Sequence, residues 1–182
     1  PPCTNIPFWW TNYFFPQNNI NYLKKYFKVE NIIGMTMWLS AIKNNSNSVL
    51  VRHNQRGYPL KALNKKMKYK ELILRKAFIN SGKSPIIKNI YSEIFSKSLN
   101  SLAFNMTAIY FQQNNKNLKL NKKAIIMLEN IMKEGEQLTK FLKLNLSQSF
   151  NDRINQTLSS SAHTMSMLSD YKAGKKVELK YL

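Results

Sequence analysis

The feature that most constrains the fold of this chain is a change of sequence pattern near Asn64. Before it, residues 29–43 and 49–53 are rich in β-branched and apolar side chains, which favour strands. After it, apolar residues recur at helical spacing. Strands in the first third and helices in the remaining two thirds predict an α+β fold that is mostly α.

Two paired strands are expected in the first third, over 29–43 and 49–53, joined by a polar turn at 44–48 and followed by a turn that starts at Gly57. An isolated strand pair is marginal in water, so other elements must cover it. Residues 1–18 contain four prolines, which argue against a helix there. Their aromatic run is expected to form buried packing or the wall of a pocket.

Four helices are expected after Asn64, over residues 69–79, 89–111, 125–142 and 150–168. The first should end near Gly82, because glycine suits a left-handed helix cap. A polar break is expected at 113–117, and Gly174 should interrupt the chain again.

The net charge of +19 is the most unusual property of the composition. The lysines are spread along the chain without a nucleic-acid-binding motif, which is typical of a solvated surface that attracts anionic substrates. One cysteine and the distant His53 and His163 exclude an internal disulfide and a zinc site, and each histidine is interpreted as structural. The sequence contains neither a Gly-x-Gly-x-x-Gly nor a Walker motif, and no apolar run reaches the roughly 18 residues of a membrane span.

Helix 89–111 carries a polar stripe that makes it the best candidate for chemistry. Lys97, Ser101 and Asn105 follow each other at i, i+4 and i+8, so they project from one side of the helix. Lysine, hydroxyl and amide groups on an otherwise core-forming helix suggest a wall of a cleft. The alternative interpretation is a solvated lysine beside ordinary helix-surface residues.

Two motifs resemble the ketopantoate reductase (2-dehydropantoate 2-reductase) family. Residues 166–178 are similar to its "S-M-L-Q-D-x-x-A-G-R-x-x-E-I" signature, and the positions in register are Ser166, Met167, Leu168, Asp170, Ala173, Gly174 and Glu178. Phe95, Lys97 and Asn105 match the spacing of its "W-x-K-L-x-x-N-x-x-x-N" helix, with Ser101 where the family has asparagine. Residues 5–10 resemble the family's "N-G-I-P-W-W" segment more weakly.

The resemblance implies a C-terminal portion of a two-domain oxidoreductase that lacks most of its Rossmann domain. Residues 1–63 would be the end of the NADP-binding domain. Residues 64–182 would be a helical catalytic domain, incomplete at its end, similar to the C-terminal domain of 6-phosphogluconate dehydrogenase. The implied reaction is cytoplasmic, NADPH-dependent reduction of ketopantoate to pantoate, for pantothenate and coenzyme A biosynthesis. The implied partners are a small 2-keto acid and a missing N-terminal half or a second copy, with no membrane and no metal.

The resemblance also implies roles for six residues. Lys97 would be the general acid, tuned by Glu178 as a second catalytic residue. The others would bind ligands: Asn105, Ser101 and Ser166 the substrate, and Asn5 the cofactor. The alternatives are that Ser166 caps a helix, that Glu178 stabilises a helix N-terminus, and that the chain is a non-catalytic interaction module or a basic anion- or nucleic-acid-binding protein.

Overall fold

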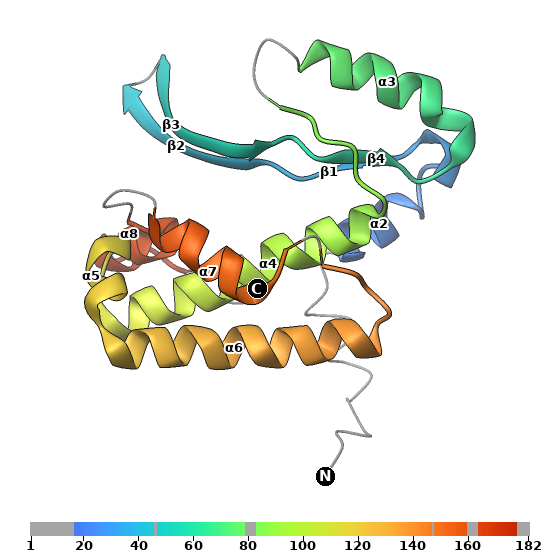
Figure 1. Cartoon of the computed structure of the whole chain (residues 1–182). Coiled ribbons are helices and arrows are strands. Elements are labelled where there is room, and N and C mark those ends of the chain that lie inside the picture. Colours follow the sequence, from blue (N-terminus) through green and yellow to red (C-terminus); the bar gives the residue numbers. More distant parts are fainter. Residues whose placement is uncertain (1–16, 46, 79–82, 147, 160–163, 178–182) are drawn as a thin grey trace. The chain divides into compact units, whose positions relative to one another are not determined.

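The computed structural model describes residues 17–45, 47–78, 83–146, 148–159 and 164–177. These residues are mostly helical with a few short strands (Figure 1), which confirms the predicted fold class. By packing, the chain divides into two compact units. We call Pro16–Lys97 the strand unit and the unit that contains Ser98–Leu182 the helical unit. This division does not test the domain boundary at 63/64, which stays a prediction.

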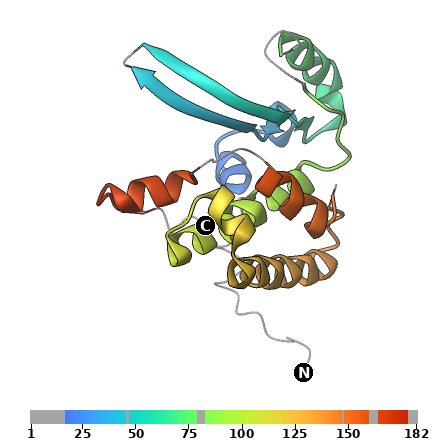
Figure 2. The same ribbon diagram turned by 60° about the vertical axis from the view of Figure 1, so that its left-hand side comes forward.

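The strand unit contains two antiparallel strand pairs. Its elements are α2 (Gln17–Leu23), the 3-10 turn η1 (Val29–Asn31), β1 (Ile33–Met35), β2 (Trp38–Asn45), β3 (Ser48–Gly57), β4 (Leu60–Ala62), the 3-10 turn η2 (Lys65–Met67) and α3 (Lys68–Ala77). β2 and β3 form a long two-stranded ribbon (Figure 2), and β1 pairs with β4.

The prediction of one strand over 29–43 is wrong. Residues 29–31 form η1, and β1 and β2 are separate strands with different partners. Their partner strands, β3 and β4, are separated at Pro59, which has no N–H to donate to a strand partner. Its carbonyl instead accepts a hydrogen bond of 3.0 Å from the N–H of Thr36, between the two pairs.

Helix α2 was not predicted, and it contradicts the expectation that residues 1–18 exclude a helix, because it begins at Gln17. Proline is compatible with the start of a helix, where the first N–H groups have no intrahelical partner. Buried Ile20 of α2 packs with Ile87 and Ile90 in the core of the strand unit.

The helical unit is built from helices around one apolar core. α4 (Ile90–Phe111) begins in the strand unit, and it is followed by α5 (Asn115–Leu120), α6 (Lys122–Phe141), α7 (Phe150–Ser159) and α8 (Ser166–Lys172). α6 packs against the part of α4 that belongs to this unit, since a Cβ built at Gly135 would lie within 3 Å of the Leu99 side chain. The fully buried core side chains include Phe104, Leu118, Leu128, Met132 and Leu168.

Two helix boundaries differ from the predictions. The supposed polar break at 113–117 contains the start of α5, since the side chain of Asn114 caps that helix by accepting from the N–H of Asn117 at 3.1 Å. The predicted helix 150–168 is two helices, because α7 ends at Ser159 and α8 begins only at Ser166. The predicted helix end near Gly82 lies outside the described residues.

Gly57 allows the chain to turn from β3 toward β4. Its φ is +66°, and a Cβ there would lie 1.8 Å from the carbonyl oxygen of Lys83. That oxygen accepts a hydrogen bond of 2.7 Å from the N–H of Tyr58, so it cannot move without breaking this contact. In the part of the chain that the structure describes, no helix is both long and apolar enough to cross a membrane.

Gly57→Ala is therefore expected to lower the free energy of unfolding by about 3 kcal/mol, from left-handed strain and a backbone clash together. Gly174 is the matched control, because its φ is +68° and nothing lies within 4 Å of a Cβ built there. Gly174→Ala should cost only about 1 kcal/mol, from strain alone. Urea denaturation of both variants measures the difference, and equal losses would contradict the clash.

Candidate active site on helix α4

Lys97 is held in place at its amino group. It lies in the second turn of α4, half-buried, and its Nζ donates a hydrogen bond of 2.6 Å to the carbonyl oxygen of Met37, between β1 and β2. Burial lowers the pKa of Lys97 below its usual value of 10.5, because the charged form loses solvation. A lysine with a lowered pKa is a better proton donor near neutral pH than an exposed one.

Ser101 and Asn105 follow Lys97 on the same face of α4, as the continuous helix requires. The amide Nδ2 of Asn105 donates to the hydroxyl of Ser101 at 3.0 Å. Asn105 is buried, and its Oδ1 has no hydrogen-bond partner among the described residues. A buried amide oxygen without a hydrogen-bond donor is unusual in proteins. The hydroxyl group of a bound ligand, or a bound water, would donate the missing hydrogen bond.

The remaining predicted site residues lie in or near α8 and at the start of the chain. Ser166 is the exposed first residue of α8, and the N-cap position belongs to Met165, so Ser166 does not cap this helix as its alternative interpretation supposed. Glu178, Asn5 and His163 lie outside the described residues, and His53 lies in β3. The structure therefore does not test whether Lys97, Ser166 and Glu178 meet.

Sequence reasoning missed an ion pair one helical turn before Lys97. The carboxylate of Glu93 contacts Arg56 of β3 at 2.6 Å, and its side chain is 3% exposed. The guanidinium carbon of Arg56 also lies 5.8 Å from the centre of the Trp38 ring. The sequence feature that could have pointed to Glu93 is its i, i+4 spacing from Lys97, which puts both residues on one face of the helix. The pair attaches the ribbon to the helix that carries Lys97.

Within the described ranges, no three His, Cys, Asp or Glu side chains come together as metal ligands would. This face of α4 presents the amine of Lys97, the hydroxyl of Ser101 and the amide of Asn105.

Comparison with known families decides the relationship. The profile described as "Ketopantoate reductase PanE/ApbA C terminal" matches residues 89–182, from the residue before α4 to the end of the chain. The chain belongs to the ketopantoate reductase family. The resemblance predicted from the two motifs is thereby confirmed. A comparison with curated proteins finds no match.

Solved structures of this family and of D-mandelate dehydrogenase share the fold at low sequence identity. A D-mandelate dehydrogenase bound to NADH and anilino(oxo)acetate is 20% identical, with a TM-score of 0.73 over 90% of this chain and 54% of its own. A PanE/ApbA family ketopantoate reductase from Ralstonia eutropha JMP134 is 15% identical, with a TM-score of 0.65 over 82% and 49%. A dimeric ketopantoate reductase from Staphylococcus aureus is 15% identical, with a TM-score of 0.64 over 86% and 54%. The chain thus spans about half the length of these structures.

Proposed function

We propose that this chain supplies the substrate-binding and proton-donating half of a reductase that reduces the keto group of a 2-keto acid with NAD(P)H. The observation that supports the proposal is the setting of Lys97, which matches the lysine of the family motif in spacing. Its side chain is half-buried, and its Nζ donates to the backbone carbonyl of Met37. Ketopantoate is the first candidate substrate and NADPH the first candidate cofactor. The NADH in the D-mandelate dehydrogenase structure supports a nicotinamide cofactor for this fold.

The nicotinamide cofactor would supply the hydride, and the residues of this chain would handle the proton and the substrate. Addition of a hydride to a carbonyl carbon leaves a negative charge on the oxygen. The protonated amine of Lys97 would stabilise that charge and transfer its proton to the oxygen. Asn5 is the residue of this chain proposed to contact the cofactor.

The polar stripe on α4 would orient the substrate. We assign the unpaired Oδ1 of Asn105 to a substrate hydroxyl, with Ser101 holding the Asn105 amide in position at 3.0 Å. Ser166 would bind the substrate carboxylate from the start of α8, and Glu178 would hydrogen-bond the substrate and tune Lys97. These roles are carried over from the family motifs.

The proposal is tested by joining the chain to the N-terminal nucleotide-binding segment of a family member. The purified fusion should oxidise NADPH when ketopantoate is added, measured by the loss of nicotinamide absorbance. Other 2-keto acids and NADH are assayed in parallel to rank substrates and cofactors. A fusion that is folded by circular dichroism and binds NADPH, yet reduces none of these acids, would reject the proposal in favour of a non-catalytic interaction module.

A further inference from the structure

The strand unit contains a basic cleft that the proposed reaction does not use. Its cavity volume is about 300 Å³, and it lies between the β4–α3 connection and the start of α4. Eleven residues line it: Lys61, Ala62, Leu63, Asn64, Lys65, Lys68, Glu71, Lys88, Asn89, Ile90 and Tyr91. All of them belong to the strand unit.

The cleft is richer in cations than the chain as a whole. Four of its eleven lining residues are lysines, whereas 28 of all 182 residues are Lys or Arg, so an average set of eleven would hold about two. A fifth cation lies beside the lining, since Nζ of Lys24 donates to the hydroxyl of Tyr91 at 3.3 Å and lies 5.8 Å from its ring centre. Several positive charges around one concave site attract an anion more strongly than charges scattered on a convex surface.

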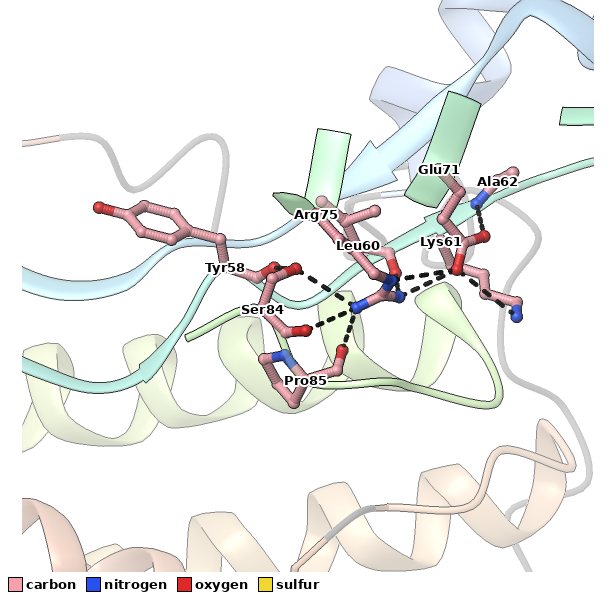
Figure 3. Close-up of polar contacts among 8 residues, drawn as sticks. All are labelled: Tyr58, Leu60, Lys61, Ala62, Glu71, Arg75, Ser84 and Pro85. Atoms are coloured by element: carbon pink, nitrogen blue, oxygen red, sulfur yellow. Dashed lines mark hydrogen bonds and ion pairs between the residues drawn. The ribbon is translucent and has the colours of Figure 1, made fainter. Parts of the chain in front are cut away.

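The one carboxylate in the lining pairs with Arg75 and with Lys61, so it leaves the other three lining lysines unpaired (Figure 3). Glu71 accepts hydrogen bonds from the N–H of Ala62 at 2.9 Å and from Arg75 at 3.0 Å, and Lys61 lies 3.9 Å away. Its charge is thus balanced within this group. Lys65, Lys68 and Lys88 form no ion pair among the described residues and are exposed.

The walls of the cleft are connected by hydrogen bonds. Arg75 of α3 donates to the carbonyl oxygens of Leu60, Ser84 and Pro85, which links α3 both to β4 and to the segment that leads into α4 (Figure 3). Asn89 caps α4 by accepting from the N–H of Tyr91 at 2.9 Å, and Asn64 caps η2 by accepting from the N–H of Lys66 at 2.9 Å. A site with fixed walls loses little entropy when it binds a ligand.

The size and lining of the cleft indicate more than a bare ion. A water molecule occupies roughly 30 Å³ of the liquid. A cleft of about 300 Å³ therefore has space for several such groups, which is more than a single phosphate group fills. Ala62, Leu63, Ile90 and the ring of Tyr91 provide an apolar surface beside the lysines. We propose that this cleft binds a small phosphorylated molecule, a phosphate or diphosphate ester whose charged group contacts Lys65, Lys68 and Lys88 and whose organic part packs against Tyr91.

Two double variants test the cleft. Each replaces two lysines with glutamates, so both change the net charge of the chain by the same amount. Lys65→Glu with Lys68→Glu alters the lining, whereas Lys66→Glu with Lys70→Glu alters exposed lysines on the same two elements that do not line the cleft. Binding of inorganic pyrophosphate, adenosine diphosphate and adenosine to the full chain is measured by isothermal titration calorimetry. Tyr91→Ala tests the contact with the organic part.

The cleft variant should weaken pyrophosphate binding about tenfold, while the control pair changes it less than about twofold. Adenosine diphosphate should bind more tightly than pyrophosphate and lose this advantage in Tyr91→Ala, and adenosine alone should bind weakly. Equal losses in both double variants, or no binding by the wild type, would overturn the proposal. Tighter binding of a single-stranded oligonucleotide that both pairs weaken alike would also overturn it, in favour of a nucleic acid partner on the whole basic surface.

Discussion

Arg75→Ala should lower the free energy of unfolding of the strand unit by about 3–5 kcal/mol, the cost of removing one partner from a buried ion pair. The Arg75 side chain is 10% exposed, and it lies 3.0 Å from the carboxylate of Glu71, whose side chain is 9% exposed. Alanine at position 75 would leave that carboxylate without its closest cation. It would also leave the part-buried carbonyl oxygens of Leu60, Ser84 and Pro85 without this donor.

Matched variants distinguish the loss of the Arg75 hydrogen bonds and ion pair from the loss of a positive charge alone. Lys76→Ala removes an exposed cation at the next position of α3 and should change stability by less than about 0.5 kcal/mol. Arg75→Lys keeps the charge but lacks the forked guanidinium, so it should fall between the wild type and Arg75→Ala. Urea denaturation gives the global value, and hydrogen exchange at the Ala62 amide, which donates to Glu71, gives the local one. Equal stability of Lys76→Ala and Arg75→Ala would contradict the role of the network.

The same network predicts how stability depends on pH. Burial by itself raises the pKa of the Glu71 carboxyl, but the hydrogen bonds from Ala62 and Arg75 and the charges of Lys61 and Arg75 outweigh it, so the net pKa lies below the usual 4.5. A carboxyl with a lower pKa in the folded state stabilises the fold above its unfolded pKa and loses that contribution as pH falls through the folded pKa. The free energy of unfolding of the wild type should therefore decline below about pH 4.5. The decline should be smaller in Arg75→Ala, because Arg75 is one of the groups that lower the pKa of Glu71.

The sequence predicted the helical part of the fold better than the strand part. Helix α4 was expected over 89–111 and spans Ile90–Phe111, because a long apolar pattern without Gly or Pro leaves few alternatives. The strands depended on which partner each segment found, and a β-branched run such as 29–43 does not contain that information. The polar break predicted at 113–117 contains the start of α5, because Asn114 caps that helix, and Asn121 caps α6 in the same way. The connection is therefore shorter than its polarity suggested.

The sequence predicted the positions of the candidate site residues within helix α4, but not their contacts with other elements. Spacing alone placed Lys97, Ser101 and Asn105 on one face, and the continuous helix α4 confirms that placement. The bond from Lys97 to Met37 and the ion pair of Arg56 with Glu93 both join residues far apart in the sequence. Such contacts depend on how the ribbon packs on α4, and no local pattern encodes that packing.

In the fusion with a nucleotide-binding segment, Lys97→Ala should reduce kcat by about 10²–10⁴-fold, the usual loss when a positioned general acid is removed. Substrate binding should change less, because the residues proposed to bind the substrate, Asn105, Ser101 and Ser166, remain. The lost hydrogen bond to the Met37 carbonyl is an exposed one, so the free energy of unfolding should fall by no more than about 1 kcal/mol. A large loss of kcat with nearly unchanged stability would distinguish a catalytic lysine from a structural one.

The pH dependence of kcat provides the second readout. In the proposed reaction Lys97 donates the proton, so activity should fall as pH rises through its pKa, and burial places that pKa below the usual 10.5. Lys97→Ala should remove this alkaline limb from the residual rate, whereas Lys97→Arg should keep a charge that does not titrate in the same range. Lys140→Ala, at an exposed lysine of α6, is the control and should keep the wild-type profile. A Lys97→Ala enzyme that retained both the wild-type kcat and the alkaline limb would exclude Lys97 as the acid and would move the search for the proton donor to another residue.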